Sequence, residues 1–161
     1  MKVLVAYMSQ TGNTKKVAEA IYDVIPQPKE IKRIEDVTSL EGYDLSFLGF
    51  PTHNFGPSNQ VKTFLKTHVK DRTIALFITH MAPEDAPPLH GWIQKFKDAA
   101  VGANIIGVFD CQGQASRLIK TLMLIPLFFM RQADTSQGQP DAARLERAKA
   151  FANEIINKLK S

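Results

Sequence analysis

The sequence predicts an α/β fold, a three-layer α/β/α sandwich around a doubly wound, five-stranded parallel sheet. Two observations predict it: five short apolar runs read as buried strands, and segments with apolar residues at helical spacing separate them. A parallel strand pair needs a crossover connection, and right-handed crossover helices cover both faces of the sheet. No repeat, linker or low-complexity stretch divides the 161 residues, so we expect a single domain over residues 1–161.

The first half of the chain contains three predicted strands and two helices. Residues 2–8, KVLVAYM, are a β-branched and aromatic run bounded by Ser-Gln-Thr-Gly, which is typical of a strand buried on both faces. Residues 13–25 follow as a helix because their apolar side chains recur at helical spacing. Residues 29–34 are a weaker strand candidate, whereas DLSFLGF at 44–50 is a strong one. A second helix is predicted over residues 59–68.

The second half repeats the alternation. RTIALFIT at 72–79 and NIIGVF at 104–109 are predicted strands, and residues 89–100 between them have the apolar spacing of a helix. The last helix is predicted over 141–159, where apolar side chains follow one face and Pro140 precedes the start.

Composition excludes several classes of protein. With 44% hydrophobic and 22% charged residues the chain has the make-up of a soluble globular protein, and no apolar run is long enough for a membrane span. The N-terminal apolar run is too short for a signal peptide, so a cytoplasmic protein is expected. The net charge of +4 comes from scattered basic residues, which disfavours nucleic-acid binding. The single cysteine, Cys111, is expected to be buried and inert, and no histidine spacing indicates a metal site.

The segment SQTGNT directly follows the first predicted strand and opens the first helix. In such a sheet ligands bind beyond the carboxyl ends of the strands, and a helix N-terminus favours an anion. Its hydroxyls can donate to phosphate oxygens, and its glycine allows a close turn. We therefore predict a phosphate-binding loop made of Ser9, Gln10, Thr11, Gly12, Asn13 and Thr14. The lone glycine fits neither a Walker A motif nor Gly-x-Gly-x-x-Gly, and the alternative is a turn in which Thr11 or Asn13 only caps the helix.

This segment resembles the FMN phosphate loop of the flavodoxin family. That loop has an aromatic residue two positions before Ser/Thr-x-Ser/Thr-Gly-x-Ser/Thr, and residues 7–14 match it at every defined position. The order of predicted elements also agrees over nearly the whole chain. The resemblance implies the flavodoxin strand order 2-1-3-4-5 and FMN as the cofactor.

Two further loops are implied to hold the isoalloxazine ring. By the resemblance, the loop after the third strand wraps the ring and consists of Pro51, Thr52, His53, Asn54, Phe55 and Gly56. Phe55 is expected to pack on the ring. Gly56 is free of the steric limit on positive φ and is expected to let a peptide reorient when the flavin gains a proton. The loop after the fourth strand, with His80, Met81 and Ala82, is expected to bond the pyrimidine edge. His53, His80 and His90 are either proton donors or ordinary exposed histidines.

The resemblance implies an electron carrier whose partners are redox proteins, a reductase and an acceptor enzyme. The loop at residues 51–56 is also similar to the Pro-Thr-x-Phe-Gly loop of flavodoxin-like NAD(P)H:quinone oxidoreductases, with one residue more. A two-electron reductase of quinones or other small molecules is therefore the alternative. A flavin-free interaction module is the third possibility.

Residues 115–139 form an apparent insert between the fifth strand and the last helix. Within it, residues 118–130 are strongly apolar. The insert has three interpretations from the sequence: a roof over the flavin, a docking surface for a partner, or a buried helix.

Overall fold

The computed structural model describes residues 1–114 and 135–160 of the chain. The five strands and four long helices predicted from the sequence are confirmed. The strands are β1 (Val3–Tyr7), β2 (Lys29–Arg33), β3 (Leu45–Pro51), β4 (Thr73–His80) and β5 (Asn104–Gln112). The helices are α1 (Asn13–Val24), α2 (Asn59–His68), α3 (Leu89–Ala99) and α6 (Ala142–Lys158). A short 3-10 helix, η1 (Ile34–Asp36), was not predicted, and β5 continues three residues beyond its predicted end.

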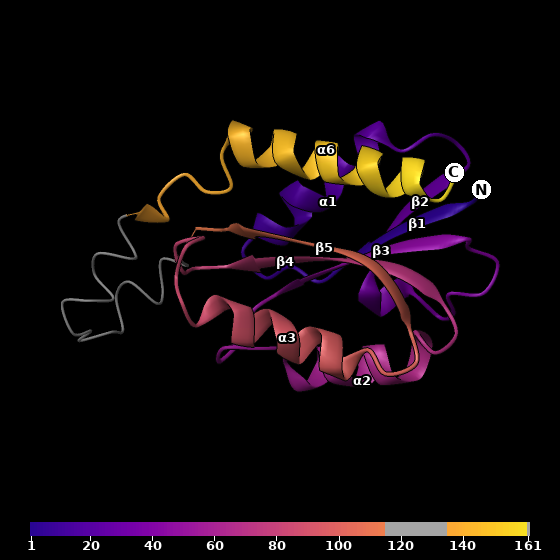
Figure 1. Ribbon diagram of the computed structural model, residues 1–161, viewed down its shortest axis with the longest axis horizontal. Helices are drawn as coiled ribbons and strands as arrows, with labels where there is room; N and C mark the ends of the chain where they lie inside the picture. Colours follow the sequence, from indigo (N-terminus) through magenta and orange to yellow (C-terminus); the bar gives the residue numbers. More distant parts are fainter. Residues whose placement is uncertain (115–134, 161) are drawn as a thin grey trace.

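All five strands are parallel and lie in the order β2-β1-β3-β4-β5, as predicted. Helices α1 and α6 cover one face of the sheet, and α2 and α3 cover the other (Figure 1). Each face has its own hydrophobic core. This is the three-layer architecture expected from right-handed crossovers.

β1 explains why a continuous apolar run is needed in the centre of such a sheet. Successive side chains of a strand point to opposite faces. Val3, Val5 and Tyr7 accordingly join the core under α1 and α6, and Leu4 and Ala6 join the core over α2 and α3. A charged residue at any of these positions would lie inside one of the two cores.

The parallel arrangement brings the carboxyl ends of β1, β3, β4 and β5 to one edge of the sheet. The loops that follow these strands therefore meet there, although they are far apart in the sequence. Most of the predicted insert, including its apolar part at 118–130, lies outside the described residues. Among the described residues, no helix is both long and apolar enough to cross a membrane.

Candidate cofactor-binding site

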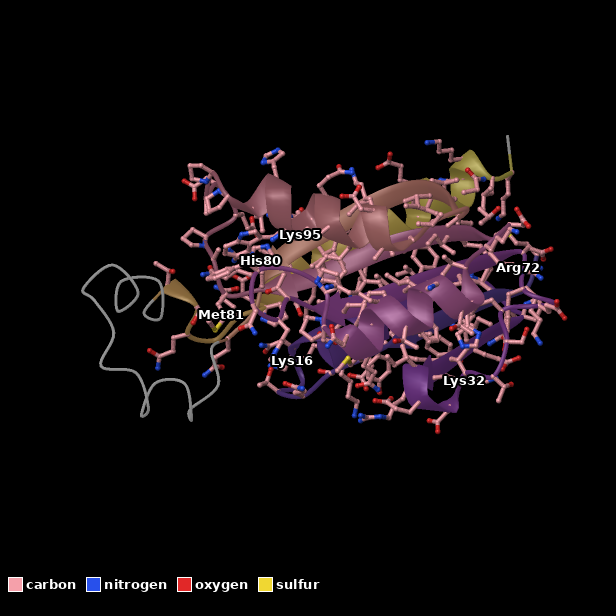
Figure 2. The ribbon with its side chains drawn as sticks, turned by 90° about the horizontal axis from the view of Figure 1, so that it is seen from below. Lys16, Lys32, Arg72, His80, Met81 and Lys95 are labelled. Carbon is pink, nitrogen blue, oxygen red and sulfur yellow. The ribbon has the colours of Figure 1, made fainter. Side chains whose placement is uncertain are left out.

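A cleft opens at the carboxyl edge of the sheet, where four loops converge. Figure 2 shows His80 and Met81 near this end of the molecule and Arg72, which precedes β4, at the opposite end. The cleft encloses about 180 Å³. Its lining residues come from all four loops: Gln10, Thr11, Asn13, Pro51, Thr52, His53, Thr79, His80, Met81, Gly113 and Gln114.

The loop between β1 and α1 leaves the first turn of the helix open to a ligand. Gly12 is the N-cap residue with φ of 87°, and its N–H donates to the Ser9 hydroxyl at 3.1 Å. No side chain caps α1, and its first turn contains no acidic residue. By contrast, Ser58 caps α2 and Asp141 caps α6 with a side-chain oxygen. The N–H groups of the first turn of α1 thus lack the acceptor that α2 and α6 supply for themselves, and α3 lacks a side-chain cap as well.

Two of the predicted phosphate ligands also form hydrogen bonds to distant parts of the chain. The Asn13 side chain donates from Nδ2 to the carbonyl of Gln114 at 2.8 Å. The Thr14 hydroxyl lies 2.8 Å from the Thr79 hydroxyl, and both threonines are buried. These bonds fasten the start of α1 to the ends of β4 and β5. Either hydroxyl can be the donor of this pair, and the Thr14 hydroxyl keeps its own proton for a phosphate when Thr79 is the donor.

Gly113 is required by this close approach. A Cβ atom at residue 113 would lie 2.8 Å from Asn13 Nδ2 and 3.0 Å from Asn13 Cβ and Cγ. Real Cβ atoms almost never come so near, so the position has no room for a side chain. The glycine allows the end of β5 to pack directly on the phosphate-binding loop.

The loop after β3 contains a tight turn. The His53 N–H donates to the Gly56 carbonyl at 2.7 Å, and the Gly56 N–H donates back to the His53 carbonyl at 3.2 Å. Asn54 and Phe55 between them have φ of 47° and 64°. Positive φ at both central residues is the pattern of a type I′ turn.

Gly56 does not itself take a positive φ in this turn. The reciprocal bonds close the turn at His53 and Gly56, so the left-handed conformation falls on the two residues between them. Gly56 is instead limited by space, because a Cβ there would meet Lys95 Cδ at 3.0 Å.

Phe55 projects from this turn at the rim of the cleft. Its side chain is 51% exposed, and its ring centroid lies 4.9 Å from that of Trp92 on α3. Lys95 Nζ, also on α3, donates to the Phe55 carbonyl at 3.2 Å. α3 therefore supports the turn, while much of the Phe55 ring stays open to a ligand. Met81 is the second exposed apolar side chain at this edge, at 37%.

His80 is enclosed, unlike His53 and His90, which are exposed. Its Nδ1 lies 2.9 Å from the Ala82 carbonyl, and its Nε2 lies 3.1 Å from Asp110 Oδ2. Both ring nitrogens thus face an acceptor. A neutral imidazole satisfies only one of the two, and a protonated ring donates to both. In this arrangement His80 orders the 80–82 loop and does not present a nitrogen to the cleft.

The carbonyl groups of the 80–82 loop are already in use. The His80 carbonyl accepts from the Gly113 N–H at 2.7 Å, and the Met81 carbonyl accepts from Gln112 Nε2 at 2.9 Å. The Ala82 carbonyl faces the His80 ring. A ligand N–H that seeks an acceptor here has to share one of these oxygens, each of which has a second lone pair.

Comparison with known proteins decides the family. A flavodoxin domain model matches residues 4–154. The chain belongs to the flavodoxin family. Protein BilS of Clostridioides difficile (strain CD3), a flavodoxin-like domain-containing protein, is 34% identical to it over an alignment of 173 positions, gaps included, that covers 98% of each chain. The predicted family is thereby confirmed.

Solved structures agree in fold with this flavodoxin-family protein. A flavodoxin from the domain Archaea superposes with a TM-score of 0.64 at 19% identity and covers 100% of both chains. Oxidised Flavodoxin 2 from Bacillus cereus gives 0.62 at 19% identity and covers 98% of this chain and 99% of its own. A flavoprotein from Lactobacillus acidophilus NCFM in complex with FMN gives 0.55 at 24% identity, over 68% of this chain and 92% of its own.

The remaining reactive groups near the cleft of this flavodoxin-family protein are buried or form ion pairs within the fold. Cys111 is buried as predicted, and burial raises the pKa of its thiol to about 12, with the nearby Glu84 and Asp110 carboxylates adding to the effect. Glu84 pairs with Arg144 at 2.8 Å and with Arg147 at 2.7 Å, which joins the loop after β4 to α6. Within residues 1–114 and 135–160, no group of three or more His, Cys, Asp or Glu side chains is placed to hold a metal ion.

Several residues of the site were not among the predicted ligands. Thr79, Gly113 and Gln114 line the cleft, and Trp92 and Lys95 support the turn that borders it. The sequence predicts the ends of β4 and β5 at this edge, and this could have indicated Thr79, Gly113 and Gln114 as residues of the site. Nothing local in the sequence indicates that α3 contacts the turn after β3.

Proposed function

We propose that this protein binds FMN in the cleft and carries electrons between a reductase and an acceptor enzyme. The observation that carries the proposal is the uncapped first turn of α1, which opens onto the cleft next to two hydroxyl side chains, Ser9 and Thr11. A phosphate group supplies the anionic acceptors that such a helix start favours.

The donor set fits the phosphate of FMN. Backbone N–H groups of the first turn of α1 would bind its oxygens, and the Ser9 hydroxyl, which accepts from Gly12, still has its own proton to donate. A Cβ built on Gly12 meets no atom within 4 Å, so the loop is open where a phosphate would approach. Lys16 lies at the same end of the molecule as Met81 (Figure 2) and adds positive charge there.

The ring of FMN would lie between the turn at residues 53–56 and the loop at residues 80–82. Exposed Phe55 and Met81 offer apolar surface for its faces. The redox chemistry is supplied by the flavin itself when it is bound. The protein's residues orient the ring, exclude water from part of it and supply polar partners at its edge.

Similarity to flavodoxins supports a carrier over an enzyme. Flavodoxins of matching length that superpose over nearly the whole chain add support.

The alternative is an NAD(P)H-dependent reductase of quinones or other small molecules, which the sequence of the 51–56 loop favours. An anaerobic reductive titration of the FMN-loaded protein separates the two. Two resolved one-electron steps, with no NADPH turnover in the presence of a quinone, are expected of the carrier. A single two-electron step with steady NADPH oxidation by the isolated protein would favour the reductase.

Cofactor binding itself is tested at Gly12, with Gly42 as a matched control. Both glycines have a positive φ, 87° and 80°, and a Cβ at either would meet no atom within 4 Å. Alanine at each position should therefore cost a similar amount of folding stability, about 1–2 kcal/mol. Only Gly12→Ala is expected to weaken FMN binding, measured by flavin fluorescence. Equal FMN affinity in the two variants, or no FMN binding by the wild type, would contradict the proposal.

A further inference from the structure

A second, larger groove is lined by residues of α2 and α3. These two helices cover the sheet face away from α1 and α6 (Figure 1). The groove encloses about 760 Å³. Four of its lining residues are lysines, Lys62, Lys66 and Lys70 from α2 and its end and Lys95 from α3, and Asp98 is the single carboxylate. The groove is thus strongly basic, although the basic residues look scattered in the sequence.

Lys62 and Lys66 form a row on α2, four residues apart on one side of the helix and about 6 Å along its axis. Lys70 follows two residues after the helix ends at His68. None of the three has an ion-pair partner among the residues that the structure describes. Elsewhere in the described residues some lysines do pair with carboxylates, as with Lys2 and Lys32, which both contact Glu30. The groove therefore has an excess of positive charge, with four lysines against the one carboxylate of Asp98.

The groove reaches the cofactor cleft. Asn54 and Gly56 line the near end of the groove, and His53 of the same turn lines the cleft. A molecule seated in the groove would therefore touch the turn that borders the predicted flavin position. Exposed apolar side chains flank it at both ends, Phe55 at 51% and Val101 at 74%.

We propose that this groove binds an acidic segment of a partner protein, one that presents several carboxylates to its lysines. The inference rests on the proposed function in one respect, since it takes that partner to be a protein that exchanges electrons with the cofactor. Docking there would bring the partner beside Phe55 and the flavin edge.

The chemistry of the groove favours a protein over a small anion. Its far end lies where α2 and α3 finish, and helix C-termini carry partial negative charge, so no backbone N–H cluster awaits a phosphate there. Lysines are flexible point charges, which attract and steer an acidic surface but hold a small anion less specifically than arginines do. The exposed Phe55 and Val101 give a protein partner apolar contacts as well.

The test is a titration of the full-length, FMN-treated protein with a fluorescein-labelled deca-glutamate peptide, followed by anisotropy at low and at physiological salt. The groove variant carries Lys62→Gln, Lys66→Gln and Lys70→Gln. The control variant carries Lys97→Gln, Lys149→Gln and Lys160→Gln, which removes the same net charge from residues that do not line the groove. We expect about a tenfold loss of peptide affinity in the groove variant, a change of less than about twofold in the control, and weaker wild-type binding as salt rises.

Equal losses in both variants would show attraction to net charge alone and overturn the proposal. Inorganic tripolyphosphate that binds the wild type more tightly than the peptide, and is lost in the groove variant, would replace the protein partner by a small anion. FMN affinity, measured on the same three proteins, should be unchanged among them. Failure of the wild type to bind FMN would overturn the proposed cofactor but leave the peptide result standing.

Discussion

Gly113→Ala is expected to weaken FMN binding through Asn13, without touching the ligand. The added Cβ would lie 2.8–3.0 Å from three atoms of the Asn13 side chain. Carbon atoms reach their optimum at about 3.5–4.0 Å, so Asn13 has to move by about half an ångström. That movement lengthens the bond from Asn13 Nδ2 to the Gln114 carbonyl, now 2.8 Å, beyond the usual range for an N–H···O bond.

The size of the effect follows from that bond. A hydrogen bond of this kind contributes about 0.5–1.5 kcal/mol, and Asn13 is the first residue of α1, so its displacement disturbs the phosphate-binding loop directly. A loss of about 1 kcal/mol corresponds to about fivefold weaker FMN binding. Gly91→Ala is the control, because a Cβ at Gly91 in α3 meets nothing within 4 Å and alanine should stabilise the helix by about 0.5–1 kcal/mol.

The assay is an FMN titration of each variant by flavin fluorescence, with thermal unfolding measured in parallel. A double mutant tests the cause: Asn13→Gly removes all three atoms that the new Cβ would meet, so Gly113→Ala should cost little more affinity in that background. The same fivefold loss with and without Asn13 would refute the reasoning, as would unchanged affinity in the Gly113→Ala single variant.

Three further outcomes are expected. Thr79→Val should lower the free energy of unfolding by about 1–3 kcal/mol, because it leaves the buried Thr14 hydroxyl without its partner. Adding Thr14→Val should restore part of this loss, as measured by thermal denaturation. No restoration would contradict a paired role for the two hydroxyls. Burial favours neutral Glu84, but bonds from Arg147 outweigh this and hold the pKa of the Glu84 carboxyl below its usual value. The pair therefore stabilises the fold above the ordinary carboxyl pKa and less as pH falls, so the Tm advantage over Glu84→Gln should shrink on acidification, and a constant difference would argue against it. Asn54→Ala should destabilise the turn by about 1 kcal/mol, because alanine tolerates a φ of 47° less well than asparagine, and an unchanged Tm would remove that constraint.

The elements and their order could be predicted from the sequence because both depend on local patterns. The run in β1 is apolar at every position, which only a strand with a core on each side requires. The parallel alternation then places the ends of β1, β3, β4 and β5 at one edge, so the sequence alone indicates which loops form the binding site. The phosphate-binding loop could be predicted in the same way, since its donors lie within six consecutive residues.

Contacts between distant segments were decided by the tertiary structure alone. Asn13 bonds a residue 101 positions away, and Thr14 bonds one 65 positions away, so no periodicity could indicate either pair. The left-handed turn at Asn54 and Phe55 likewise depends on reciprocal bonds across the turn, and α3 supports it from outside. The basic groove needs lysines from two helices on one face. Side-chain period determines which face of an element is buried, but only packing determines which faces meet.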